Sequence, residues 1–302
     1  MTDQAKKLRE LARRSQFCEI KTQPADYMWR QNQSSTRQRV IAVSSGKGGV
    51  GKTNLVANLG IALAKAGKKV LILDADLGLA NIDVLLDITP RYNLQHLIAG
   101  EKSMSDILIE GPHEMKIVPG GSGISELANL SDEKREQLIS GFVELEKEAE
   151  ITLIDTGAGI SRNILSFILA AGEAFVITTP EPTAITDAYG LVKVLSREDP
   201  DIDIKLLVNM VTGESEANEI AERIARVSKK FLNKHVDTFG HIVTDTSVGR
   251  AVRKQEPFIL SYPNCEAAQC INRLTTKLDN EIPETYEGQG FRGFLSRLWS
   301  RQ

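Results

Sequence analysis

Hydrophobic and polar positions form two kinds of segment along the chain. Short runs of mostly apolar, often β-branched residues occupy 39–44, 69–74, 115–118, 151–155, 174–178, 204–209 and 238–243. Stretches with helical spacing of apolar residues lie between them, at 53–65, 131–148, 161–171, 184–196 and 215–232. A continuous apolar run is typical of a strand buried on both faces, as in parallel sheets. The alternation predicts an α/β fold, a mostly parallel twisted sheet with helices on both faces.

Two polar segments divide the chain. Residues 21–38 are rich in Gln, Asn, Ser and Thr, and residues 283–290 contain Pro283, Gly288 and Gly290. Both patterns are typical of linkers. The expected organisation is therefore an N-terminal helix at 1–20, a linker at 21–38, an α/β domain at 39–282, a linker at 283–290 and a C-terminal helix at 291–302.

Composition narrows the class of protein. The chain has 302 residues, of which 41% are hydrophobic and 25% charged, close to an ordinary globular protein and unlike a collagen or a disordered chain. Its three cysteines form no CxxC pair, so we expect reduced thiols and no structural zinc site. The first thirty residues lack an apolar run, and no stretch reaches about 18 consecutive apolar residues. We therefore expect neither a signal peptide nor a membrane-spanning helix.

The charge is unevenly distributed. Residues 1–39 carry nine basic and four acidic side chains, and residues 288–302 carry three Arg and no acid, whereas residues 40–287 have a balance of −11. Both tryptophans also lie in the end segments. Basic ends on an acidic body suggest that the ends meet an anionic or acidic partner, although basic tails that only aid solubility remain an alternative.

The clearest chemical motif is GKGGVGKT at 46–53, which fits the phosphate-loop pattern G-x-x-x-x-G-K-[ST] between a strand and a helix. Backbone N–H groups and the helix N-terminus would face the phosphates. Lys52 would neutralise the β- and γ-phosphates, and the Thr53 hydroxyl would bind Mg²⁺. The expected nucleotide-binding residues of the loop are Gly46, Lys47, Gly48, Gly49, Val50, Gly51, Lys52 and Thr53.

A second lysine in the loop, Lys47, is not needed to hold phosphate within one subunit. It could reach the nucleotide of another subunit and stabilise charge during hydrolysis, as an arginine finger does. A solvated loop lysine is the alternative.

The motif KGGVGKT resembles the deviant Walker A motif of the MinD/ParA class of P-loop ATPases, and the resemblance runs over about 40–275. It implies ATP hydrolysis to ADP and phosphate with Mg²⁺, and an ATP-driven homodimer in which Lys47 is the signature residue.

The same resemblance assigns the acidic residues. The segment DADLGLANID at 74–83 looks like switch I, in which Asp76 matches the aspartate that orients the attacking water beside Mg²⁺. Asp155, in DTGAG, matches the Walker B aspartate, a water-mediated Mg²⁺ partner. Gly157 stands where the class often has Pro, so switch II is expected to be looser. The catalytic residues implied are Lys47, Lys52 and Asp76, and the metal-binding residues are Thr53, Asp76 and Asp155.

Three further positions match nucleoside contacts of the class. Glu181, in TTPEP, matches a residue that approaches the ribose of the partner subunit. Asn209 matches the adenine-reading asparagine, and Asp245 lies in the later loop on the base side. Val243 stands where that loop usually has Pro, which leaves the contact of Asp245 open.

The C-terminal segment FRGFLSRLWSRQ places its large apolar residues on one helical stripe: Phe291, Phe294, Leu295, Leu298 and Trp299. A short helix with Trp, Arg and no acid can lie in the interface of an anionic membrane. The segment also resembles the membrane-targeting tail of the MinD branch. We predict membrane contact, with docking on the protein's own core as the alternative.

The N-terminal segment MTDQAKKLRELARRSQ has a narrow apolar stripe among basic residues, as a surface helix or a helix for a partner's groove would. Its residues Asp3, Gln4, Ala5, Leu8 and Arg9 match D-Q-A-x-x-L-R. This looks like the activator element of FlhG proteins, the flagellar-number ATPases of the MinD class. The resemblance implies that the helix stimulates the GTPase of a partner of the signal-recognition-particle type, FlhF.

Together these features predict an FlhG-type ATPase switch for flagellar number and placement, in the cytoplasm and peripherally on the inner face of the cell membrane. Flagellar basal-body components are a further expected class of partner, and no specific nucleic acid is expected.

The main alternative is a partition-type ATPase that binds DNA non-specifically, which would need a basic face. A second alternative is an ATPase of the same superfamily that donates electrons or serves as a scaffold for iron–sulfur clusters, which would need cysteine thiolates near the dimer interface. A tyrosine kinase of this superfamily would have a tyrosine-rich tail. A binding module would hold nucleotide without turnover.

Overall fold

The computed structural model describes residues 38–76, 82–121, 134, 138, 141–142, 149–281 and 290–300. The predicted N-terminal activator helix, most of the 21–38 linker, residues 77–81 of the switch and nearly all of the 283–290 linker lie outside these residues. Of the predicted helix at 131–148, only Lys134, Leu138, Gly141 and Phe142 are described, and all four are helical.

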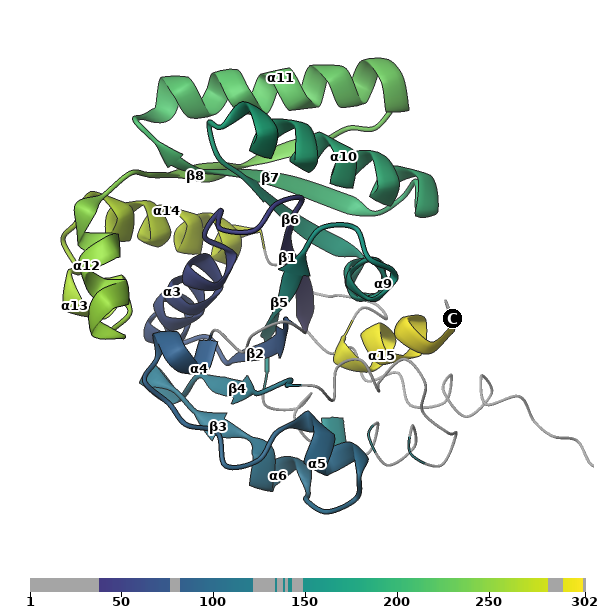
Figure 1. Cartoon of the computed structure of the whole chain (residues 1–302), viewed down its shortest axis with the longest axis vertical. Helices are drawn as coiled ribbons and strands as arrows, with labels where there is room; N and C mark the ends of the chain where they lie inside the picture. The colour runs from purple at the N-terminus through teal and green to yellow at the C-terminus, as the bar shows by residue number, and fades with distance from the viewer. Residues whose placement is uncertain are drawn as a thin grey trace, which may run out of the picture. The chain divides into compact units, whose positions relative to one another are not determined.

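The described part of the chain is built on one sheet of eight strands in the order β3-β4-β2-β5-β1-β6-β7-β8 (Figure 1). Every neighbouring pair is parallel except β3 and β4. The strands are β1 (Arg39–Ser45), β2 (Val70–Ala75), β3 (Ile109–Glu110), β4 (Lys116–Val118), β5 (Ile151–Ala158), β6 (Glu173–Thr178), β7 (Asp203–Val211) and β8 (Asp237–Val243). The predicted fold class is thus confirmed, and each predicted strand is present. The two-residue β3 is too short for periodicity to reveal.

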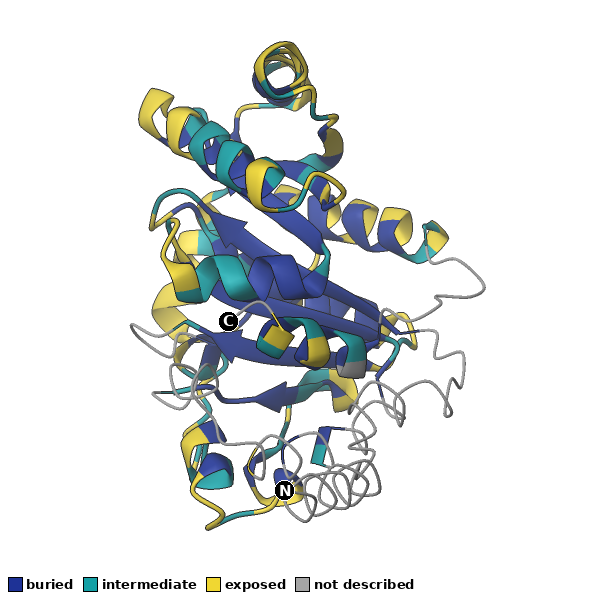
Figure 2. Cartoon of the chain, turned by 90° about the vertical axis from the view of Figure 1, so that its right-hand side faces the viewer, coloured by how far each residue is buried: buried dark blue, intermediate teal, exposed yellow. Residues whose placement is uncertain are grey.

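Helices cover both faces of the sheet. One face packs against α3 (Lys52–Lys65), α4 (Ile82–Leu85), α12 (Thr246–Lys254), α13 (Phe258–Ser261) and α14 (Glu266–Asn280). The other packs against α5 (Leu94–Ile98), α6 (Met104–Ile107), α9 (Arg162–Ala171), α10 (Pro182–Glu198), α11 (Glu214–Leu232) and α15 (Phe291–Ser300). A short 3₁₀ turn, η1, spans Pro112–Glu114. The central strands are buried along most of their length, and most helices are buried on one side only, whereas α3 is buried on all sides over residues 55–64 (Figure 2).

Local sequence explains where several helices begin. The Ser161 hydroxyl accepts a hydrogen bond from the Ile164 N–H and caps α9, which ends at Gly172 with a φ of 78°. Helix α11 has Glu214 and Glu216 in its first turn and lysines in its last, which complements the helix dipole. No helix among the described residues has both the length and the apolar character needed to cross a bilayer.

Helix α15 lies against the domain in this conformation, which is the alternative to membrane contact that the sequence left open. Phe291, Phe294, Leu295 and Leu298 are each at most 1% exposed, and Trp299 packs against the same core. The Phe291 ring stacks on that of Phe142, with centroids 4.5 Å apart. The apolar stripe was identified correctly, but in this conformation it is buried on the protein's own core. Burial of these side chains contributes about 1.5–3 kcal/mol each.

Polar contacts fix the two ends of α15. At its start the Phe291 N–H donates to Gln38 Oε1 over 2.6 Å. Near its end, Arg297 Nε donates to the Ala170 carbonyl at the end of α9, over 2.7 Å. The tail therefore docks by specific hydrogen bonds as well as by apolar contact.

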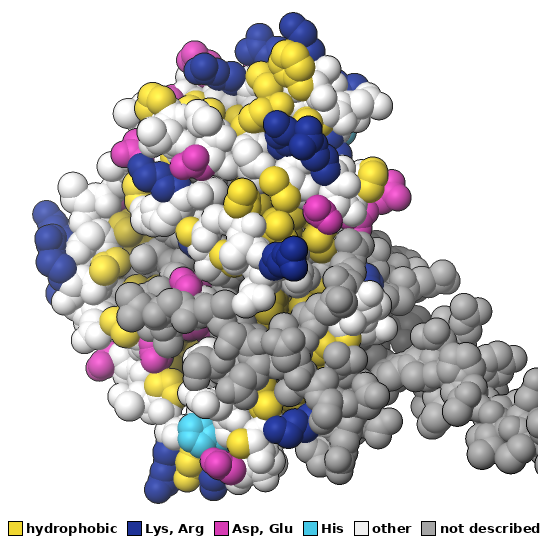
Figure 3. All heavy atoms as spheres, turned by 45° about the vertical axis from the view of Figure 1, so that its right-hand side comes forward, with side chains coloured by type: hydrophobic (Ala, Val, Ile, Leu, Met, Phe, Trp, Pro, Cys, Tyr) yellow, Lys and Arg dark blue, Asp and Glu magenta, His cyan; other side chains and the backbone are white. Residues whose placement is uncertain are grey.

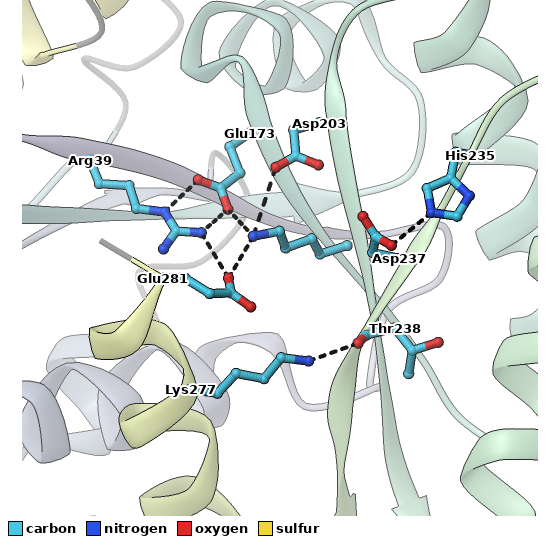
Figure 4. A network of polar contacts seen from close by, with 9 residues as sticks. Arg39, Glu173, Asp203, His235, Asp237, Thr238, Lys277 and Glu281 are labelled. Atoms are coloured by element: carbon cyan, nitrogen blue, oxygen red, sulfur yellow. Dashed lines mark hydrogen bonds and ion pairs between the residues drawn. The ribbon is translucent and has the colours of Figure 1, made fainter. Parts of the chain in front are cut away.

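A buried charge cluster lies at the amino ends of the central strands, the edge opposite the phosphate loop (Figure 4). Arg39, 2% exposed, donates from Nε to Glu173 Oε2 over 2.7 Å. Lys205 Nζ lies 2.7 Å from Glu281 Oε2 and 3.4 Å from Glu173 Oε1. Burial opposes ionisation of Glu281, but Lys205 and Arg39 hold the pKa of its carboxyl below the usual value. The cluster ties β1, β6 and β7 to the end of α14.

We expect Arg39→Ala to lower the free energy of unfolding by about 3–5 kcal/mol, because it leaves the buried Glu173 carboxylate without its main partner. Urea unfolding measures this as a lower midpoint at an unchanged slope. The matched control is Lys68→Ala, which breaks the more exposed 2.6 Å pair with Asp279 and should cost less than about 1 kcal/mol. Equal midpoints for the two variants would show that the buried cluster does not stabilise the fold.

Candidate functional site

The phosphate loop connects the carboxyl end of β1 to the start of α3, as the motif requires. Two positions of the loop require glycine because neighbouring atoms leave no room for a Cβ. A Cβ on Gly46 would lie 2.3 Å from the Asp187 carbonyl of α10, and one on Gly51 would lie 2.4 Å from the Asn209 amide nitrogen. Gly51 also has a φ of 94°, a left-handed conformation that favours glycine. The loop is thus held between α3, α10 and the end of β7.

The two lysines of the loop have opposite environments. Lys52 is 7% exposed, and burial lowers the pKa of its ammonium group, an effect opposed by the nearby Asp155 and Asp76 carboxylates. The side chain of Lys47 is 40% exposed, and its Nζ lies 2.6 Å from Glu181 Oε2 and 3.2 Å from Thr183 Oγ1. Lys52 therefore faces the interior of the site, whereas Lys47 lies at its surface.

Asp74 and Asp155 are neighbours across the sheet, since they are register partners on β2 and β5. Burial raises the pKa of Asp155 to about 7 and that of Asp74 to about 6. Asp74 Oδ1 accepts a hydrogen bond from the Asp76 N–H over 3.2 Å, so the buried Asp74 fixes the backbone of the half-buried Asp76. The parallel sheet thus brings Asp76 and Asp155 close to Lys52.

Asp155 fits the role of a magnesium partner. It is fully buried, and although the Thr53 hydroxyl is close enough to lower its pKa, neither carboxylate oxygen accepts a hydrogen bond of good geometry. A buried carboxylate in this state needs a cation or water. Across the described residues there is no group of three or more His, Cys, Asp or Glu that could hold a metal. A Mg²⁺ ion here would therefore take most of its ligands from phosphates and water, which is its usual preference.

Asp76 lies against switch II. A Cβ built on Gly157 would be 3.4 Å from Asp76 Oδ1 and 3.2 Å from Ile164 Cδ1. A side chain at 157 would therefore crowd Ile164 and make an ordinary contact with Asp76, which lies next to the segment that follows Asp155. Asp76 itself is only half-buried, as a residue that orients a water must be.

The predicted nucleoside contacts are partly used within the chain. Asn209 Nδ2 donates to the Val50 carbonyl over 2.8 Å, which places the predicted adenine reader against the phosphate loop. Glu181 pairs with Lys47 of the same chain, so the structure does not show the predicted contact with a partner's ribose. Asp245 caps α12 through the Ser247 N–H and also accepts from the Ala267 N–H, a structural role that sequence reasoning missed.

Two residues near the loop were not found from the sequence. Thr183 contacts Lys47, and its only sequence signal was its place two residues after Glu181. Met210 has a φ of 59° and is 45% exposed beside the loop. No local pattern marks it, because its position follows from a break in the pairing of β7 and β8.

Comparison with known proteins agrees with this geometry. A family model described as the CobQ/CobB/MinD/ParA nucleotide binding domain matches residues 41–258. The chain belongs to this family. The matched range contains the phosphate loop, Asp76, Asp155 and Asn209, so the resemblance to the MinD/ParA class is confirmed.

Several known proteins are similar to this chain over most of their length. The chain is 39% identical to the antiactivator FleN of Pseudomonas aeruginosa over 261 residues, covering 86% of this chain and 93% of FleN. It is 34% identical to the flagellum site-determining protein YlxH of Helicobacter pylori, covering 86% and 89%. Among solved structures, Pyrococcus horikoshii MinD complexed with Mg-ADP has a TM-score of 0.63 at 25% identity, covering 80% of this chain and 96% of that one.

Proposed function

We propose that this protein is an ATP-hydrolysing switch that dimerises with ATP, associates with the membrane and regulates flagellar number and placement. The proposal rests mainly on the different environments of the two lysines in the phosphate loop. Lys52 is buried beside Asp155, whereas Lys47 is exposed at the surface. The similarity to FleN and to a flagellum site-determining protein supports the flagellar role. The Mg-ADP of a similar MinD structure supports the choice of ligand.

In the proposed mechanism the burial of each residue matches the part of the nucleotide on which it acts. Lys52 would neutralise the β- and γ-phosphates, and Thr53 and Asp155 would hold a Mg²⁺ ion, which would supply charge neutralisation at the transferred phosphoryl group. Asp76 orients the attacking water from the half-exposed end of β2. Lys47 leaves Glu181 and reaches the nucleotide of the second subunit, an exchange that costs little because exposed ion pairs contribute only about 0–1 kcal/mol.

Membrane association in this proposal requires α15 to leave the core. Its apolar stripe is the only part of the predicted tail suited to a membrane interface, and in the present conformation that stripe is buried. Two tails on one dimer would bind a vesicle much more firmly than one, because the second contact is intramolecular. Dimerisation and membrane contact are therefore coupled.

The proposal is tested by sizing the full chain with ATP and with ADP. We expect a dimer with ATP only, and we expect Lys47→Ala to bind nucleotide but to dimerise poorly and hydrolyse slowly. Mixing Lys47→Ala with Lys52→Ala subunits should restore part of the hydrolysis, because the second variant still offers Lys47 to the first one's nucleotide. Lys68→Ala is the matched surface control. If the mixture hydrolyses no faster than its parts, Lys47 does not act across subunits.

The same samples with vesicles test the membrane step. In a Trp29→Phe background Trp299 is the sole tryptophan, so its fluorescence reports the environment of α15. We expect ATP to change that fluorescence in the presence of anionic vesicles, with ADP and purely zwitterionic vesicles as controls. Equal vesicle binding by a monomer without ATP would contradict the coupling.

The N-terminal helix is proposed to stimulate the GTPase FlhF separately from the ATPase. We expect a peptide of residues 1–20 to raise GTP hydrolysis by FlhF, with Gln4 as the key residue. Its amide can donate and accept near a γ-phosphate or water, whereas a lysine only donates. Gln4→Ala should remove most of the stimulation while keeping the charge, and Lys7→Ala should keep most of it. Full stimulation by the Gln4→Ala peptide would contradict the role of Gln4 and would show that the basic charge of the peptide suffices.

The alternatives receive less support. DNA binding of the partition type requires a continuous basic face. On the face drawn in Figure 3, Lys and Arg side chains lie in separate places among hydrophobic and acidic ones. A cluster scaffold requires accessible thiolates, but burial raises the pKa of the Cys265 thiol and Cys270 is 1% exposed. Flagellar regulation by an ATPase therefore remains the function that the described residues and relatives support best.

A further inference from the structure

Helix α11 carries its apolar stripe beyond the core that the helix covers. Its buried side chains include Ile220, Ile224 and Ser228, which are spaced four residues apart along one side of the helix. Phe231 follows Ser228 by three residues and so lies on the same side. It is nevertheless 67% exposed, the highest fraction among the large hydrophobic side chains that the structure describes. The stripe therefore ends in an aromatic ring that has no core beneath it.

Basic side chains flank this ring in the sequence. Residues 226–236 contain no acidic residue and four basic ones: Arg226, Lys229, Lys230 and Lys234. Lys229 and Lys230 are exposed, and Lys230 Nζ lies 5.2 Å from the centroid of the Phe231 ring. In Figure 3 the hydrophobic side chains at the top of the molecule, where α11 lies in Figure 1, are bordered by Lys and Arg. An exposed aromatic ring between lysines is suited to the interface of an anionic membrane.

The ring lies at the same edge of the sheet, and on the same face, as helix α15. The end of α11 is followed within five residues by the start of β8 at Asp237, which places it at the amino edge. Arg297 of α15 donates to the Ala170 carbonyl, close to the start of β6. Leu232 and Trp299 both pack against the core of this face. Only β7 separates β6 from β8, a distance of about 10 Å, so a flat membrane that receives α15 also faces the end of α11.

The neighbouring loop limits what charge alone contributes. The connection between α10 and β7 lies at the same edge and carries Asp199 and Asp201. Lys234 Nζ donates to the Pro200 carbonyl over 2.6 Å, which holds this loop against the end of α11. Its acids repel anionic lipid, so burial of the Phe231 ring has to supply most of any binding to a membrane.

We propose that residues 226–236 form a second contact with an anionic lipid surface, in which Phe231 enters the headgroup region and Lys229 and Lys230 pair with lipid phosphates. This inference rests on the proposed membrane association, to which it adds a site on the body of the protein. Phe231 is exposed while α15 is docked, so this contact forms first. Insertion of a released α15 then becomes an intramolecular step, which strengthens the overall binding.

The test measures cosedimentation of the full chain, with ATP, with vesicles of phosphatidylglycerol and phosphatidylcholine. We expect Phe231→Ala to weaken binding by about tenfold and Lys230→Gln to weaken it by about threefold to fivefold. Asp201→Asn should strengthen binding, because it removes a negative charge from the neighbouring loop. Leu260→Ala is the matched control, since Leu260 is also exposed but lies in α13 on the opposite face of the sheet.

A tryptophan in place of Phe231 reports the contact directly. In a background of Trp29→Phe and Trp299→Phe, the substitution Phe231→Trp introduces the sole tryptophan of the chain. Tryptophan is at home in the membrane interface, so we expect its emission to shift to the blue with anionic vesicles and to stay unchanged with zwitterionic ones. Because the side chain is exposed, Phe231→Ala should keep the urea midpoint and the vesicle-free ATP hydrolysis of the wild type.

Three results would count against the second contact. Wild-type vesicle binding by Phe231→Ala, or unchanged emission of the Phe231→Trp variant with anionic vesicles, would overturn it. Loss of binding to a single-stranded oligonucleotide in Phe231→Ala, with vesicle binding intact, would overturn it in favour of a nucleic acid. A wild-type chain that binds no vesicle would overturn the proposed membrane association as well.

Discussion

Lys52→Ala is expected to abolish useful nucleotide binding. Lys52 is 7% exposed and close to the Asp155 and Asp76 carboxylates, so its ammonium acts where water screens it little. Removing one partner from such a buried charge contact costs about 2–5 kcal/mol, roughly 30-fold to several thousand-fold in Kd. Titration of ATP and ADP at fixed Mg²⁺ measures the loss.

The matched control is the other lysine of the same loop. Lys47→Ala removes the same charge five positions earlier, on the surface of the loop, and should keep nucleotide binding within a few-fold of the wild type. A thermal unfolding curve confirms that Lys52→Ala is folded. If Lys52→Ala and Lys47→Ala bind ATP equally well, the buried lysine is not the phosphate ligand.

Asp76→Ala is expected to separate binding from hydrolysis. Its carboxylate lies beside Gly157 and its backbone is held by Asp74, so it is placed near the site without forming the phosphate loop. Loss of a positioned acid or base group typically lowers a rate about 10²-fold to 10⁴-fold. We expect ATP hydrolysis to fall by that amount while ATP still binds and the dimer persists.

Two further variants sharpen this prediction. Asp76→Asn keeps the size of the side chain and removes its charge, so it should lose hydrolysis as Asp76→Ala does. Asp83→Asn changes another acidic residue of the same segment, whose carboxylate accepts from the neighbouring Val84 N–H, and should hydrolyse ATP normally. Turnover of ATP by Asp76→Ala at the parental rate would remove Asp76 from the mechanism.

The sequence predicted the strands and the phosphate loop well because both depend on short-range information. Continuous apolar runs at 39–44 and 151–155 specify strands buried on both faces, and those strands are central in the sheet. The loop at 46–53 is contiguous, so its glycines, Lys52 and Thr53 are brought together by the strand and helix on either side. Asp155 was assigned by its resemblance to the Walker B aspartate, and its approach to Lys52 arises because the carboxyl ends of parallel strands share one edge of the sheet.

The sequence alone determined which face of each element is apolar and where the phosphate loop lies. Only the tertiary structure decided what those faces meet. The stripe of residues 291–302 is equally suited to a membrane or a core, and in this conformation it packs on the apolar surface formed by Phe142 and α9. Lys47 meets Glu181, and Arg39 meets Glu173, across 134 residues of chain. Such pairs, like the bulge at Met210, depend on strand order and register, which arise from the packing of the whole sheet.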